Sequence, residues 1–355
     1  MILKDLLRVL GSADRRDGRN LTKQEAFQAF ASILEGKESE IRVTAFLTAM
    51  RWKGVSVEEL TGFATAARQM ANLPCVGMSG LVCVCAPMDG YDEVPPLELA
   101  SSLVAAASGV RVLILTDRGI PPRRGLTAAS ALESLGAGLF WDPHKAEDCV
   151  AEIGFAALSL TSVLPALLGL RRVRGDMAMR TPLHTVEKLI LPPTASVVIG
   201  TQAGPVLGIA VETMSNLGHP SGIALQGLRG GTTPTVRKRT RGIELSGQHQ
   251  TPLTVDPADF GLQNQADPEL PMFGPPDEGR GSGDNPALRK AAGEMVRDVL
   301  EGHLGPARDA TVLGCAVLLK AAGRVMTLAE GVDTAITSLD SGSPRDVLDK
   351  FVGWR

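Results

Sequence analysis

The chain has 355 residues, of which 44% are hydrophobic and 21% charged, and its formal net charge is −3. This composition is ordinary for a globular protein that can bury a full core, and it argues against a uniformly basic nucleic-acid binder while leaving room for a local basic groove. No apolar run approaches 18 residues, and charged and apolar side chains alternate at the start. A membrane span and a signal peptide are therefore not expected.

Three helical patterns, separated by Gly36 and Gly54, occupy residues 21–71. Capping boxes begin two of them: Thr22 with Glu25, and Ser56 with Glu59. We expect an N-terminal helical domain over residues 1–73, joined by helices from about residues 165–190. A module this small favours packing, or assembly of a homodimer, over a ligand site of its own.

An α/β domain is predicted over residues 74–355, with a mainly parallel central sheet flanked by helices. Residues 81–85 and 111–115 are typical of buried parallel strands, and an Ala-rich helix is expected between them over residues 97–108. A helix ending at Gly136 completes a βαβ unit. Because ligands bind beyond the carboxyl ends of parallel strands, we expect the loops after both strands to line any site.

The remaining part of the chain contains three amphipathic helices and one irregular segment. The helices are predicted over residues 286–301, 308–322 and 327–339. Residues 251–285 are rich in Pro, Gly, Asp and Gln and show no periodicity, so a mobile or partly disordered surface insertion is expected there.

The cysteines are odd in number and do not follow metal-ligand spacing. They are Cys75, Cys83, Cys85, Cys149 and Cys315. Cys83 and Cys85 would lie on one face of a strand, but no second pair accompanies them. Reduced, buried thiols are therefore a better interpretation than a zinc site, and they favour a cytoplasmic protein.

Several motifs together indicate a family. Residues 33–39, 45–51 and 57–62 resemble the N-terminal helical domain of anthranilate phosphoribosyltransferase and its relatives, the family 3 glycosyltransferases. Residues 132–136 are similar to the family's Leu-Glu-Ala-Leu-Gly. The similarity continues in Val173-Arg174, Met179-Arg180-Thr181, residues 305–309 and residues 328–331. The resemblance covers nearly the whole chain and implies a phosphoribosyltransferase fold.

The substrate motifs of that family are altered here. Its Gly-Thr-Gly-Gly-Asp loop, whose backbone amides hold the pyrophosphate of phosphoribosyl pyrophosphate, corresponds to Cys85-Ala86-Pro87-Met88-Asp89, and proline has no N–H to donate. Its Lys-His-Gly-Asn-Arg corresponds to residues 116–120. Its magnesium-binding Asp-Glu pair falls on residues 231–233, where threonines cannot replace carboxylates. We therefore expect both the pyrophosphate site and the magnesium site to be degraded.

Residues 91–97, 112–115, 121–124 and 184–189 resemble a branch of the family that lacks these motifs, dimerises and is associated with nucleic-acid binding. Basic residues form three clusters that could follow the former phosphate site. They are Arg118, Arg123 and Arg124; Arg171, Arg172, Arg174 and Arg180; and Arg229, Arg237, Lys238, Arg239 and Arg241. The plain alternative is that such runs are solvated surfaces.

Two residues between the βαβ unit and the later strands, Arg174 and His184, could each have either a ligand-binding or a structural role. The family counterpart of Arg174 contacts the anthranilate carboxylate, yet an arginine there can equally form a hinge ion pair. His184 with Lys188 one turn later could meet a phosphate or carboxylate, although a lone histidine is more often a hydrogen-bonded structural residue.

Two function classes remain open at this stage. The first is a binding protein, without cofactor, whose basic cleft holds DNA, RNA or a phosphorylated small molecule by charge. The second is a glycosyl transferase of altered substrate, or anthranilate phosphoribosyltransferase itself, with Asp89 and Asp117 as the candidate catalytic carboxylates. Magnesium would be needed only by the second class.

Overall fold

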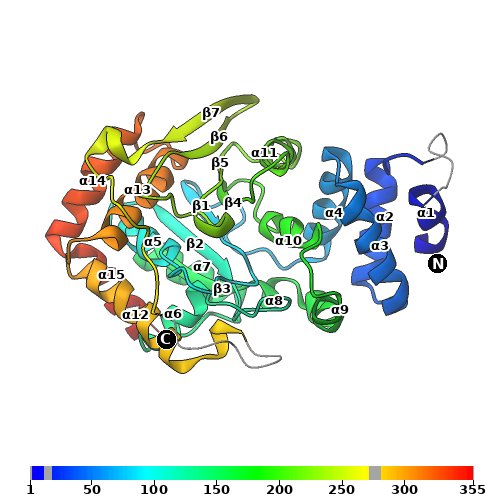
Figure 1. The fold of residues 1–355 in the computed structure, drawn as a ribbon, viewed down its shortest axis with the longest axis horizontal. Coiled ribbons are helices and arrows are strands. Elements are labelled where there is room, and N and C mark those ends of the chain that lie inside the picture. Colours follow the sequence, from blue (N-terminus) through cyan, green and yellow to red (C-terminus); the bar gives the residue numbers. More distant parts are fainter. Residues whose placement is uncertain (1, 12–17, 272–280, 355) are drawn as a thin grey trace.

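The computed structural model describes residues 2–11, 18–271 and 281–354. Four helices form a bundle at one end of the molecule, which we call the helical bundle (Figure 1). They are α1 (Ile2–Leu10), α2 (Lys23–Leu34), α3 (Glu40–Lys53) and α4 (Val57–Met70). Both predicted capping boxes are confirmed, at Thr22 with Glu25 and at Ser56 with Glu59.

The larger part of the molecule is built on one seven-stranded sheet, in the order β3-β2-β1-β4-β5-β6-β7. The strands are β1 (Leu81–Cys85), β2 (Arg111–Thr116), β3 (Phe155–Ser159), β4 (Ser196–Gly200), β5 (Ser221–Leu225), β6 (Thr240–Ser246) and β7 (His249–Val255). The first five in this order are parallel, whereas β6 and β7 pair antiparallel at one edge. Every residue of β1 is buried, which explains its continuous apolar sequence.

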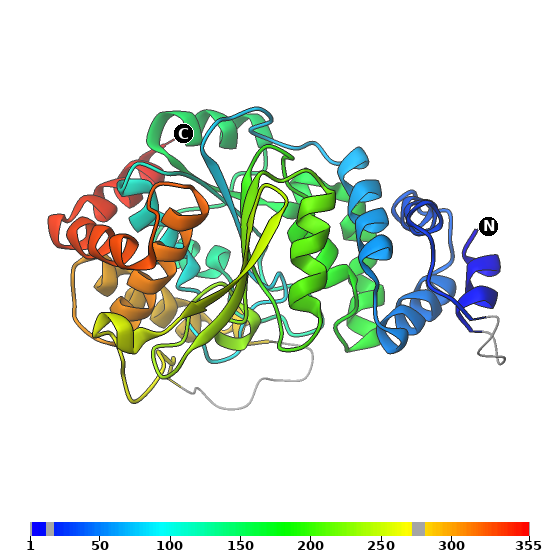
Figure 2. The ribbon, with the colours of Figure 1, turned by 90° about the horizontal axis from the view of Figure 1, so that it is seen from above.

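Helices cover the sheet on both sides and connect it to the bundle. They are α5 (Glu98–Ala107), α6 (Ala128–Ser134), α7 (Pro143–Ile153), α8 (Leu160–Val163), α9 (Arg171–Met177), α10 (Leu183–Val186), α11 (Val206–Asn216), α12 (Pro286–Leu300), α13 (Pro306–Ala321), α14 (Leu328–Ser341) and α15 (Ser343–Gly353). The short α9 contacts α3, while α10 and α11 contact α4, so these three helices lie between the sheet and the bundle (Figures 1 and 2).

The predicted fold class, a small N-terminal helical part with a large α/β part around a mostly parallel sheet, is confirmed. Two details differ from the sequence prediction. Residues 251–255 belong to the edge strand β7 and residues 257–260 to a short 3₁₀ helix, so the irregular segment begins later than expected. Residues 272–280 of that segment lie outside the described residues. Helix α15, which follows α14 directly, was not predicted.

None of the helices in the described part of the chain is long and apolar enough to cross a membrane. The five cysteines are free and buried, as the interpretation of reduced thiols expects.

Candidate functional site

A cavity of about 290 Å³ lies between the helical bundle and the carboxyl ends of β1 and β4. Its polar lining includes Arg51, Asp89, Arg180, His184, Lys188 and Gln202. This is the edge of the sheet at which a ligand was expected, and the loop after β1 does contribute. The loop after β2 does not, because none of residues 117–125 is among the described residues that line the cavity.

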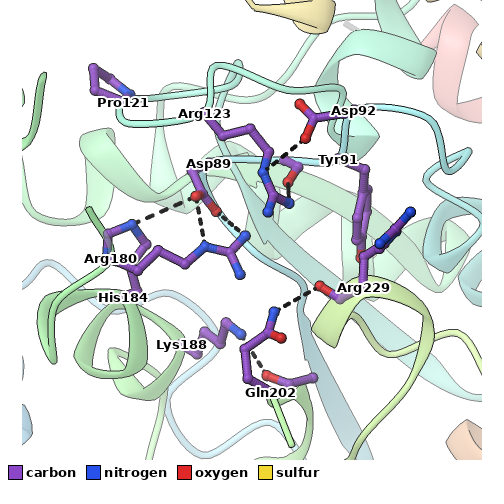
Figure 3. A network of polar contacts seen from close by, with 12 residues as sticks. Asp89, Tyr91, Asp92, Pro121, Arg123, Arg180, His184, Lys188, Gln202 and Arg229 are labelled. Atoms are coloured by element: carbon purple, nitrogen blue, oxygen red, sulfur yellow. Dashed lines mark hydrogen bonds and ion pairs between the residues drawn. The ribbon is translucent and has the colours of Figure 1, made fainter. Parts of the chain in front are cut away.

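Asp89 is the acidic group of this cavity, and it is held by an arginine. Its carboxylate is 1% exposed and accepts hydrogen bonds from Arg180 Nε at 2.8 Å and Nη2 at 2.7 Å (Figure 3). The Nε2 atom of His184 lies 3.8 Å from the same carboxylate. A bidentate pair of this kind fixes both side chains, so Asp89 is engaged as an ion-pair partner.

Arg174 lies behind the cavity in a second, fully buried ion pair. It donates to Pro121 O at 2.9 Å and to the Glu187 carboxylate, and its Nη2 atom lies 2.9 Å from His184 Nε2. Burial raises the pKa of Glu187, although the adjacent guanidinium opposes that shift. Arg174 does not line the cavity, so the structure places it in the buried ion pair that was the alternative to ligand contact.

His184 and Lys188 both line the cavity, one helical turn apart. Burial lowers the pKa of His184 well below its usual value, and Arg174 adds to the shift, so the imidazole is neutral near pH 7. Its Nδ1 accepts a hydrogen bond from Thr181 N at 3.2 Å. Lys188 lies in the 3₁₀ helix Glu187–Leu189 and donates from Nζ to Gly200 O at 2.5 Å. Burial, followed by repulsion from Arg180, lowers its pKa to about 8.

Asp117, the other candidate catalytic carboxylate, has a structural position. It accepts hydrogen bonds from Ser159 Oγ and Thr161 Oγ1, both at 2.5 Å, and from Thr161 N at 3.1 Å. These contacts tie the end of β2 to the end of β3, and burial raises the pKa of the carboxyl. Asp117 does not line the cavity, which leaves it without access to a ligand there.

The structure does not bring the three basic clusters together around one cavity. Several members form ion pairs on the surface: Arg118 with Glu133, Arg123 with Asp92, Arg172 with Glu40, Arg229 with Glu93, and Arg239 with Asp256. Arg124, Arg237, Lys238 and Arg241 are exposed. Of all three clusters, only Arg180 lines the cavity.

Tyr91 lies between the loop after β1 and the loop at residues 230–233, which the family resemblance associates with substrate. Its side chain is 1% exposed and its backbone pairs with Leu126. The ring lies against Gly231: a Cβ added at that glycine would be 2.0 Å from Tyr91 Oη and 2.9 Å from Cζ. The loop after β1 and the loop at residues 230–233 are therefore in direct contact through this ring.

The residues at the position of the family's magnesium pair do not fit that ion. Gly231, Thr232 and Thr233 are buried and offer no carboxylate, whereas a hard cation prefers charged oxygens. Within the residues that the structure describes, no three His, Cys, Asp or Glu side chains are grouped so as to hold a metal ion.

A helical bundle followed by a helix-flanked, mostly parallel sheet, with a cavity between them at the strand ends, is the architecture of a two-domain transferase. Residues 92–345 match the family described as "Glycosyl transferase family, a/b domain", and residues 13–71 match "Glycosyl transferase family, helical bundle domain". The chain belongs to this glycosyl transferase family.

Several named relatives of this chain are anthranilate phosphoribosyltransferases. The one from Methanobrevibacter smithii is 28% identical over 361 residues, covering 99% of this chain and 98% of the relative. The one from Rubrobacter xylanophilus is 29% identical over 337 residues, covering 94% of each. The crystal structure of the anthranilate phosphoribosyltransferase from Thermus thermophilus superposes with a TM-score of 0.81 at 25% identity, covering 99% of this chain and 98% of the other.

The Saccharomyces cerevisiae protein in complex with PRPP and Mg has a TM-score of 0.79 at 16% identity, covering 99% of this chain and 97% of the yeast chain. At that identity the likeness concerns the fold alone.

Sequence reasoning missed three residues that shape the site: Arg51, Tyr91 as a buried ring, and Gln202. Gln202 follows the end of β4 by two residues, so it would have been found by the strand-end rule had that strand been predicted. Arg51 is supplied by the bundle and has no local signal. The contact between Tyr91 and Gly231 joins residues 140 positions apart, which no spacing pattern reveals.

Proposed function

We propose that this protein is an anthranilate phosphoribosyltransferase-like binding protein that does not transfer phosphoribosyl groups and instead holds a small phosphate-bearing ligand in the cavity beside the helical bundle. The observation that carries this proposal is the buried ring of Tyr91 against Gly231. By resemblance, these two loops are where the pyrophosphate and its magnesium would lie, and a ring between them takes that space.

The chemistry of the loops supports the same conclusion. The loop after β1 contains Pro87, which has no N–H for an anion, and Asp89, whose charge is directed at Arg180. Without a metal ion or a set of backbone amides at these two loops, the charge that develops in phosphoryl or glycosyl transfer is not stabilised there, and each loss of about 1.4 kcal/mol slows the reaction tenfold.

The cavity itself favours an anion. Its lining contains three cationic side chains, Arg51, Arg180 and Lys188, against the single carboxylate of Asp89. At about 290 Å³ it lies at the lower limit of ligand pockets, which supports a small ligand over a polymer. Apolar walls from Met50, Val206 and Ile209 would cover the part of the ligand that carries no charge.

Isothermal titration tests this proposal. We expect ribose 5-phosphate or inorganic phosphate to bind, and phosphoribosyl pyrophosphate with magnesium to show no additional, metal-dependent affinity. Arg180→Gln should weaken phosphate binding at least tenfold, whereas Arg237→Gln, at an exposed position away from the cavity, should leave it unchanged. Turnover of anthranilate with phosphoribosyl pyrophosphate would contradict the proposal outright.

Nucleic acid is a second candidate ligand, favoured by the exposed run Arg237, Lys238 and Arg241 near the start of β6. Binding through this surface would weaken steeply with salt, because each neutralised phosphate releases counterions. A DNA titration at low and physiological salt, with the double charge reversal Arg237→Glu and Lys238→Glu, tests it. Binding that survives the reversal, or that ignores salt, would rule out this surface.

We also propose that the protein forms a homodimer through the helical bundle. Helix α3 exposes Ile41 and Trp52, with 83% and 80% of their surfaces accessible, which is uncommon for side chains of this size on a monomer's surface. Sedimentation of the wild type and of an Ile41→Glu variant tests this, since the variant should be monomeric if α3 is the contact. A wild-type monomer at all concentrations would contradict it.

A further inference from the structure

Lys188 is a buried lysine of the cavity whose hydrogen bond goes to a backbone carbonyl and not to a carboxylate. The side chain is 9% exposed, lines the cavity, and points between His184 and Gln202 (Figure 3). Among the described residues, its one hydrogen bond runs to the Gly200 carbonyl at 2.5 Å, at the end of β4. A lysine amine that is tied only to a carbonyl keeps its remaining hydrogen-bonding positions for whatever enters the cavity.

Four titratable groups interact electrostatically with Lys188. Arg180 repels its positive charge, while Asp89, Cys85 and Glu187 favour that charge. Burial and the repulsion from Arg180 together outweigh these three groups, and the pKa falls to about 8. Below that pH, the neutral amine is about 250-fold more abundant than in an ordinary lysine, whose pKa is about 10.4. Desolvation beside a second cation is a known way to make a lysine nucleophilic.

We propose that Lys188 is a nucleophilic amine that forms an imine with a phosphate-bearing aldehyde held in this cavity. The inference rests on the proposed function, since it assigns the class of phosphate-bearing ligand. The amine nitrogen attacks the carbonyl carbon, and the carbonyl oxygen takes up an amine proton to become a hydroxyl. That hydroxyl then leaves with a second proton as water, so amine and aldehyde give imine and water without any further reactant.

The surroundings suit both halves of such a ligand. A neutral amine still has two N–H groups, so it can keep its bond to Gly200 while its lone pair is available. The protonated imine that follows is a cation, and Asp89 is the carboxylate of the same cavity. Arg51 and Arg180, which line the cavity as well, are the groups that would take the phosphate.

Pyridoxal 5′-phosphate is a suitable probe, because it is a phosphate-bearing aldehyde whose imine is fixed by borohydride reduction. The full-length protein is incubated with it, reduced, digested and mapped by mass spectrometry. We expect one adduct, at Lys188, forming at least tenfold faster than with pyridoxal, which lacks the phosphate. Inorganic phosphate should slow the reaction, and the rate should rise with pH through a midpoint near 8.

Two variants sharpen the result. Lys188→Arg keeps a cation but should form no adduct at this position, whereas Lys320→Arg, which changes a partly buried lysine paired with Glu244 far from the cavity, should react as the wild type does. The adduct is mapped on the wild-type protein, so the test can still be read if one of the two variants folds poorly.

The possible failures are distinguishable. If the wild type binds inorganic phosphate by titration but Lys188 stays unmodified while other lysines react, the imine is wrong and the proposed function stands. If pyridoxal and its phosphate label Lys188 equally and phosphate does not bind, the assignment to phosphate-bearing aldehydes is wrong together with the proposed function.

Discussion

Replacing Gly231 by alanine should destabilise the protein, because the new methyl group would clash with the ring of Tyr91. The backbone at this glycine has φ −87°, which any residue can adopt, so alanine brings no backbone strain. The three atoms nearest the added Cβ all belong to Tyr91, with Oη at 2.0 Å, Cζ at 2.9 Å and Cε1 at 3.0 Å. Because Tyr91 is buried, its ring cannot swing into solvent, and overpacking of this kind costs about 3 kcal/mol.

The double variant separates the clash from other effects. Tyr91→Ala alone should cost about 3–5 kcal/mol, as expected for a buried aromatic side chain. In Tyr91→Ala with Gly231→Ala the clash is absent, so the combined cost should fall short of the sum by about 2–3 kcal/mol. Denaturant unfolding followed by circular dichroism measures all four proteins. Additive costs, or a Gly231→Ala variant as stable as the wild type, would refute the packing described here.

Three further predictions concern buried charges. Arg174→Met should lower the free energy of unfolding by about 3–5 kcal/mol, because it leaves Glu187 buried without its partner. Adding Glu187→Met in the same chain should recover part of that loss. An Arg174→Met variant that is as stable as the wild type in denaturant unfolding but no longer binds phosphate would instead assign this arginine to the ligand. His219 has its pKa lowered to about 3 by burial, so acidification from about pH 6.5 to 3 should destabilise the fold as the unfolded state takes up a proton, by at most about 1.4 kcal/mol per pH unit. In His219→Gln the melting temperature should depend less on pH over that range. A pH dependence equal to that of the wild type would contradict a neutral His219 in the folded state. Asp89→Asn should raise the affinity for inorganic phosphate in a titration, since it removes the cavity's carboxylate; unchanged affinity would place the anion elsewhere.

The sequence predicted the elements whose signals are local. The strand at residues 81–85 and the capping boxes at Thr22 and Ser56 depend on neighbours within a few positions, and each was located to the residue. Helix α15 was missed, although Gly342 ends α14 and Pro344 lies in the first turn of α15. Glycine after a helix and proline in the first turn of the next are typical of such a junction.

The site was predictable only in part, because charge pairing depends on the tertiary structure. Asp89, Arg180, His184 and Lys188 were all singled out and all line the cavity. Asp117 was singled out for the same reason as Asp89, its place after a strand, yet it is enclosed by Ser159 at the end of β3 and by Thr161 in α8. A basic run cannot show whether each cation has a carboxylate beside it, and for Arg239 that partner, Asp256, lies on the far side of a hairpin.

The loop after β1 and the loop at residues 230–233 are physically linked through Tyr91. A loop that binds pyrophosphate must leave room for the ligand and its metal, and such a space costs packing free energy whenever it is empty. Under the proposed function the buried ring of Tyr91 takes that space, and the ring requires a residue without a side chain opposite it, which Gly231 provides. The ring of Tyr91 and the absence of a side chain at Gly231 therefore depend on each other, so a substitution in one of these two loops changes the packing of the other.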